Sequence, residues 1–72
     1  MGTVFRWVIY PGEGEPFAMW HFDAAIAKAE GEAKDHPGET VKLRDDDTGL
    51  LLAIWHGDGT HQVWRDRWPQ PA

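Results

Sequence analysis

One segment of the sequence, residues 24–35, has the spacing of apolar side chains that is typical of an α-helix. Four apolar side chains recur at i, i+4, i+7 and i+11 and form a single stripe: Phe22, Ile26, Ala29 and Ala33. Asp23 is predicted as the N-cap, because its carboxylate can accept hydrogen bonds from the free backbone N–H groups of the first helical turn. Residues 36–38, His-Pro-Gly, end the helix. Since the stripe is narrow and mostly Ala, this helix can lie close to a sheet.

The other apolar segments are predicted as β-strands. They are rich in β-branched and aromatic residues and are separated by turns that contain Gly, Pro and Asp: 3–10, 17–22, 39–44, 50–56 and 60–65. The sequence therefore predicts an α+β fold, a small antiparallel sheet of four to five strands with one α-helix packed on one face. The element order is β-β-α-β-β-β. The chain is expected to form a single domain over residues 1–72, with a loose C-terminal tail at 66–72.

Residues 50–56 are apolar on both predicted faces of their strand. Leu50, Leu52 and Ile54 alternate with a second apolar set: Leu51, Ala53 and Trp55. This pattern is typical of a central strand that is covered on both sides.

The residue types that are missing exclude several kinds of site. The 72 residues contain no Cys and no Ser, which rules out disulfides, thiolate metal ligands and Cys or Ser nucleophiles. The remaining His and carboxylate side chains are scattered over turns, and nothing places an activated nucleophile beside a base. We therefore expect a protein that is not an enzyme and has no cofactor.

The charge and hydropathy of the chain indicate a soluble protein. The formal net charge is −5, and no stretch reaches the roughly 18 apolar residues that a membrane span requires. The N-terminus lacks the features of a signal peptide. A cytoplasmic location without membrane contact is predicted, and the acidic balance disfavours general nucleic-acid binding.

The sequence contains more apolar sheet surface than one helix can cover. The strand at 3–10 places Phe5, Trp7 and Ile9 on one face and a second apolar set on the other: Val4, Val8 and Tyr10. The chain also contains five Trp. Either a strongly twisted sheet curls around its second face, or that face meets a partner protein or a second copy of the chain as a homodimer.

Trp and Arg are enriched at the energetic centres of protein interfaces. The residues predicted to bind a partner are therefore the aromatic and basic side chains near the chain ends together with the acidic turn: Trp7, Trp64, Arg65, Arg67, Trp68, Asp45, Asp46 and Asp47. The acidic turn would face a basic partner surface. Interleaved Trp and Arg in 64–68 leave open an alternative, a module that binds single-stranded nucleic acid by stacking and phosphate pairing.

Two His residues border a predicted hairpin turn. In a tight hairpin His56 and His61 would lie nearly opposite each other, with Asp58 close by, and zinc accepts such ligands. The spacing is generic and no fourth ligand is evident, so the sequence predicts solvated strand ends and no metal.

The second half of the chain resembles small phage-encoded anti-CRISPR proteins that carry a helix on a curved antiparallel sheet. The resemblance rests on the succession of 39–43 (ETVKL), 49–53 (GLLLA), 57–59 (GDG) and 63–66 (VWRD) after a short helix. It implies a stoichiometric inhibitor or adaptor that occupies a basic or nucleic-acid-binding surface of its target in the host cytoplasm. A self-associating structural domain is the alternative from a different class.

Overall fold

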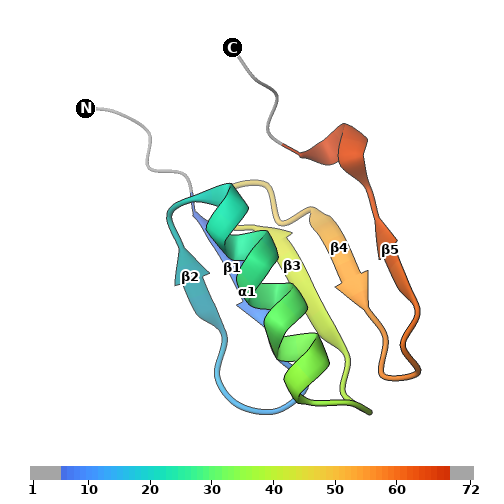
Figure 1. The fold of residues 1–72 in the computed structure, drawn as a ribbon. Helices are drawn as coiled ribbons and strands as arrows, with labels where there is room; N and C mark the ends of the chain where they lie inside the picture. The colour runs from blue at the N-terminus through green and yellow to red at the C-terminus, as the bar shows by residue number, and fades with distance from the viewer. Residues whose placement is uncertain (1–5, 69–72) are drawn as a thin grey trace.

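The computed structural model describes residues 6–68 and contains one helix and a five-stranded sheet (Figure 1). Along the chain the elements are β1 (Trp7–Tyr10), β2 (Phe17–Met19), α1 (Phe22–Asp35), β3 (Val41–Asp45), β4 (Leu51–Trp55), β5 (His61–Val63) and the 3₁₀ turn η1 (Arg65–Arg67). The predicted α+β class and element order are confirmed.

All neighbouring strands of the sheet are antiparallel, in the order β2-β1-β3-β4-β5. After the β1–β2 hairpin, α1 crosses one face of the sheet and returns the chain to β3, which pairs with β1. In this register Ile9 lies opposite Leu43, at the centre of the sheet. The short strands β2 and β5 form the two edges.

The core lies between α1 and the central strands. Its fully buried members are Ile9, Ala25, Ala29, Val41, Leu43, Leu52 and Ala53. Both helix residues in this set are Ala, so the helix backbone comes close to the sheet, as the narrow stripe predicts. Trp7 and Ile9 face α1 while Val8 and Tyr10 face away, because successive strand residues alternate between faces.

The predicted faces of 50–56 are wrong, because β4 contains a bulge. Arg44 pairs with Leu51 and Leu43 pairs with Ala53, so Leu52 is an extra residue on β4. Leu52 and Ala53 are therefore adjacent and both buried in the core, while Leu51 lies on the face away from α1.

The predicted helix start at Ala24 and the predicted N-cap Asp23 are also wrong. The helix begins at Phe22, His21 occupies the N-cap position without a side-chain hydrogen bond, and Asp23 lies in the first turn. The ring of Phe22 packs edge-on against Trp7 at 5.5 Å and against Trp68 at 5.0 Å between centroids. These aromatic contacts stabilise Phe22 at the first position of the helix.

The strands predicted at 17–22, 50–56 and 60–65 are longer than the observed ones, and the strand predicted at 39–44 is shifted, because β3 begins at Val41 and ends at Asp45. The segment 17–22 ends as a strand at Met19, and 60–65 ends at Val63. Residues 66–68 are predicted to be part of a loose tail. In the structure, residues 66 and 67 are part of η1, and Trp68 forms a hydrogen bond with Leu52 of β4. Val4, Phe5 and residues 69–72 lie outside the described part of the chain.

Candidate binding site

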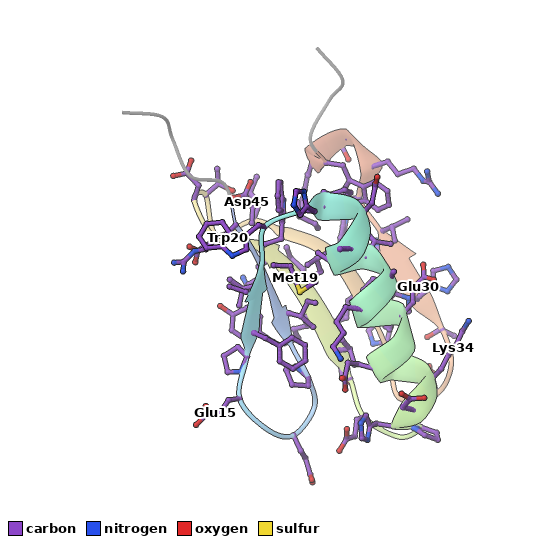
Figure 2. The ribbon with its side chains drawn as sticks, turned by 60° about the vertical axis from the view of Figure 1, so that its left-hand side comes forward. Glu15, Met19, Trp20, Glu30, Lys34 and Asp45 are labelled. Atoms are coloured by element: carbon purple, nitrogen blue, oxygen red, sulfur yellow. The ribbon has the colours of Figure 1, made fainter. Side chains whose placement is uncertain are left out.

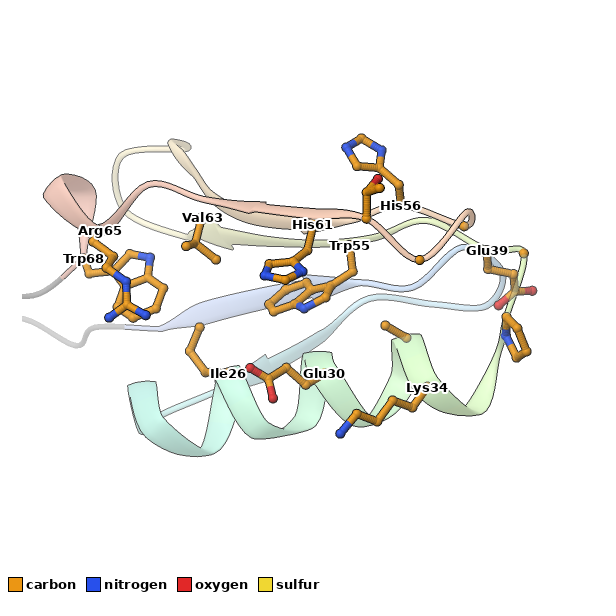
Figure 3. A pocket seen from close by; sticks show the side chains of 16 residues that line it. Ile26, Glu30, Lys34, Glu39, Trp55, His56, His61, Val63, Arg65 and Trp68 are labelled. Atoms are coloured by element: carbon orange, nitrogen blue, oxygen red, sulfur yellow. The ribbon is translucent and has the colours of Figure 1, made fainter.

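A trough lies between α1 and the last two strands. The helix packs chiefly on β1, β2 and β3, so the helix-facing side of β4 and β5 is only partly covered: Leu52 and Ala53 are buried, while Trp55 and Val63 are half-buried. The space has a volume of about 520 Å³ (Figure 3). Its walls come from the outer side of α1 and from the β4–β5 hairpin. We call this cavity the trough.

A contact between two glycines closes one end of the trough. The N–H of Gly38 donates to the carbonyl oxygen of Gly57 at 3.2 Å, which ties the loop after α1 to the β4–β5 turn. A Cβ atom on Gly57 would lie 2.5 Å from the carbonyl oxygen of Gly38. Only a residue without a side chain allows this approach.

Trp68 closes the other end. Its ring contacts Phe22 at the start of α1, and its indole N–H donates to the carbonyl oxygen of Leu52 in β4 at 3.0 Å. The guanidinium of Arg65 lies 5.0 Å from the centroid of the same ring. The helix and β4 are thus connected at both ends of the trough and separated between them.

The lining of the trough is mainly apolar with a polar rim. Ile26 and Ala33 on the helix face Trp55 and Val63 on the strands. The rim carries charged or titratable side chains from both walls: Glu30, Lys34, His61 and Arg65. Apolar cavities of this size with a few polar groups are the usual form of ligand and peptide sites.

The trough opens beside an unpaired strand edge. The carbonyl of Thr60 accepts from the N–H of His56, and the N–H of Trp64 donates to Leu52, so residues 60 and 64 point their peptide groups toward β4. In an antiparallel sheet, successive residues of a strand direct their N–H and C=O groups to opposite sides of that strand. The N–H and C=O groups of His61 and Val63 therefore point away from β4. They are able to pair with an added strand.

The predicted partner-binding residues lie in four separate places, of which the acidic turn at 45–47 is one. Arg65 and Trp68 lie at the end of the trough, and Arg67 and Trp64 lie together on the side of the sheet away from α1, 5.1 Å apart. Trp7 packs against the core, and its buried indole N–H has no hydrogen-bond partner within residues 6–68.

Two of the three carboxylates of the acidic turn are used inside the domain. The Asp45 carboxylate accepts from the N–H groups of Asp47 at 2.8 Å and Thr48 at 3.3 Å. Asp46 pairs with Arg6 at 2.9 Å. Of these three carboxylates, only that of Asp47 forms no hydrogen bond or ion pair within residues 6–68.

The His pair does not converge. Figure 3 shows His61 directed toward the helix and His56 directed to the opposite side of the hairpin. Asp58 accepts from the hydroxyl of Thr60 at 2.6 Å and from its N–H at 3.0 Å, and the hydroxyl contact is the main reason why the pKa of Asp58 is lowered. Residues 6–68 contain no group of three His, Asp or Glu side chains that could hold a metal ion.

Two exposed aromatic side chains, one at the end of β1 and one just after β2, are not among the residues predicted to bind a partner. Trp20 is 59% exposed, the largest exposed fraction among the large hydrophobic residues of the described chain, and Tyr10 is 38% exposed. Met19 is directed toward the helix and Trp20 away from it (Figure 2). The period-two alternation of the segment 17–20 is the signal that could have identified Trp20.

Comparison of the chain with protein-family models, curated proteins and solved structures gave no match. Within residues 6–68, α1 is too short and too polar to cross a bilayer.

Proposed function

We propose that this domain is a stoichiometric protein-binding domain, an inhibitor or adaptor, that receives an extended segment of its partner in the trough beside β5. It acts by binding and not by catalysis. The observation that carries the proposal is the juxtaposition of an apolar trough and the free peptide groups of His61 and Val63. Proteins commonly recognise extended peptides by adding them as a strand at such an edge.

The chemistry of the trough defines the segment that would fit. A strand added to β5 directs every second side chain toward the helix side, where Trp55, Val63 and Ile26 offer apolar contact. Lys34 and Arg65 are at the rim, and neither forms an ion pair within the described chain. An apolar residue flanked by an acidic one is therefore the expected recognition element.

The resemblance to anti-CRISPR proteins makes the proposal more specific. The segments that carry it lie in β3, β4, the β4–β5 turn and the chain from Val63 into η1, which include part of the sheet wall of the trough. The specific proposal is a phage-encoded inhibitor that occupies a functional surface of a nucleic-acid-handling complex in the host cytoplasm.

The test uses a backbone substitution at the edge. His61→Pro removes the N–H of residue 61, which points away from β4, so the hydrogen bonds between β4 and β5 stay intact. A strand added at the edge would lose one backbone hydrogen bond and would clash with the proline ring. His61→Ala removes the same side chain and keeps the N–H. Tagged wild type and both variants, checked for folding by circular dichroism, are used to capture partners from a lysate with and without nuclease.

A stoichiometric protein that survives nuclease, is retained by His61→Ala and is lost with His61→Pro would support the proposal. Equal recovery by both variants would remove the β5 edge from the interface. Light scattering measures the oligomeric state of the wild type and of His61→Pro. A wild-type dimer that becomes a monomer in His61→Pro would show that the β5 edge pairs with a second copy of the chain.

A further inference from the structure

The face of the sheet away from α1 carries a second, chemically different surface. Strand register puts a mixed set of basic, aromatic and apolar side chains on it: Val8, Tyr10, Lys42, Arg44, Leu51, Ile54 and Gln62. Arg6, Trp20 and Trp64 continue it at the margins. We call this the outer face. The helix covers only the opposite side of the sheet (Figure 1).

Each aromatic ring of the outer face lies beside a guanidinium. Arg6 is 5.8 Å from the ring centroid of Trp20, and Arg44 is 5.9 Å from that of Tyr10. Arg67 and Trp64 make the third pair. Cation–ring pairs therefore lie at three places on this face: beside β2, between β1 and β3, and after β5.

Three of the four cations of the outer face have no ion-pair partner among the described residues. Arg6 is paired with Asp46, but Lys42, Arg44 and Arg67 form no ion pair within residues 6–68. No strand position on this face holds a carboxylate. The acidic residues lie on α1, in turns and loops, in η1 and at the end of β3, where Asp45 pairs with Trp7 on the opposite face. A chain with a net charge of −5 thus presents one locally positive surface.

We propose that the outer face binds single-stranded nucleic acid. Lys42, Arg44 and Arg67 supply cations for the phosphates. Tyr10, Trp20 and Trp64 supply rings on which bases stack, the combination that non-specific single-strand sites use. The unpaired cations favour an anionic ligand by charge complementarity. The aromatic rings beside the cations favour an anion that carries flat bases as well as phosphates. The trough takes no part in this site.

The proposal gives a quantitative expectation for salt. Three phosphate contacts on a single strand give a slope of about −2 for log affinity against log salt, at about 0.7 per contact. Removing Lys42 and Arg44 leaves one contact and a slope of about −0.7. The acidic remainder of the domain weakens the affinity but adds no contacts.

The experiment titrates a fluorescently labelled 15-mer of deoxythymidine at low salt and follows anisotropy. Lys42→Ala/Arg44→Ala is expected to weaken binding about tenfold or more at low salt. The matched control for the single variant Lys42→Ala is Lys28→Ala, which removes one charge from the helix at a residue outside the trough and is expected to change affinity less than about twofold. Tyr10→Leu is expected to weaken binding about fivefold by loss of stacking.

Thermal melting checks that each variant is folded. Arg44 also donates to the carbonyl of Gly49 at 3.1 Å, so Lys42→Glu alone, which breaks no hydrogen bond, replaces the double variant if that one melts early. Absence of binding by the wild type would overturn the proposal, as would equal weakening by the helix control. Tighter binding of a polyglutamate peptide than of the oligonucleotide would also overturn it and assign the face to an acidic protein.

Discussion

The carbonyl oxygen of Gly57 accepts a hydrogen bond from the N–H of Gly38 at 3.2 Å, and the two backbones pass so closely that neither a side chain nor a solvent layer separates them. This contact fixes the β4–β5 turn against the end of the helix. It is one of the two connections that hold the trough in shape. Its energetic weight can be measured.

Gly57→Ala is expected to destabilise the domain by about 1–3 kcal/mol, because the added methyl group forces the two backbones apart. The measurement is urea denaturation followed by Trp fluorescence. An unchanged free energy of unfolding would mean that the turn moves without cost, and the closed end of the trough would then not be a rigid feature.

Gly31→Ala is the matched control and a prediction in its own right. Gly31 lies inside α1, and a Cβ atom there would have no neighbour within 4 Å. Ala favours helix over Gly, so this variant is expected to be more stable by about 0.5–1 kcal/mol. Thermal melting should show a midpoint higher by several degrees, since about 4–8 °C corresponds to 1 kcal/mol in a domain of this size. A lower midpoint would indicate that the helix is crowded at this position.

Trp68 is expected to matter for stability more than Trp64. Trp68→Ala removes a ring that contacts Phe22 and packs against the core, and should cost about 2–4 kcal/mol. Trp64→Ala should cost less, because Trp64 lies outside the core cluster and is covered by Arg67. Chemical denaturation of both variants decides the order. If Trp64→Ala lowered the free energy of unfolding more than Trp68→Ala, the side chains of the outer face would contribute more to stability than those at the end of the trough.

Trp68→Phe separates the two contributions of this side chain. The phenyl ring keeps an aromatic contact with Phe22 and loses the hydrogen bond to Leu52. The expected loss is about 1 kcal/mol, as for an ordinary hydrogen bond. A loss as large as that of Trp68→Ala would assign the whole effect to the shape of the indole.

Asp58 provides a prediction about pH. Hydrogen bonds from Thr60 stabilise the charged carboxylate and lower its pKa below the ordinary value of 3.8. The stabilisation is therefore present above the pKa of the unfolded chain and is lost as pH falls through the lower pKa of the folded state. In Thr60→Val the pKa of Asp58 should rise toward 3.8, measured by NMR titration of the side chain, while Thr60→Ser should keep it low. Equal values in all three proteins would contradict the role of the hydroxyl.

Much of the fold follows from local pattern. The apolar stripe and the His-Pro-Gly stop define α1 to within two residues, because a helix buries one face at a period set by its own geometry. The alternation of Trp7 and Ile9 with Val8 and Tyr10 assigns both faces of β1 before any pairing is known. The small Ala residues of the stripe also anticipate the close approach of helix and sheet.

The candidate sites could not be predicted in the same way. The bulge at Leu52 depends on the register between β3 and β4, and it changes which face Leu51 occupies. Asp45 and Asp46 look like a free acidic surface in the sequence, but their carboxylates bind the turn and Arg6. His56 and His61 look like a pair, but the hairpin directs them to opposite sides.

Local sequence pattern is therefore enough for the set of elements, their order and the inward face of most of them, since these depend on spacing along a few residues. The position of the trough depends instead on where the folded helix stops covering the sheet. The tertiary structure also decides which cations stay unpaired. The physical reason is that exposure and charge pairing depend on contacts between residues far apart in the chain, such as Arg6 with Asp46 and Trp68 with Leu52.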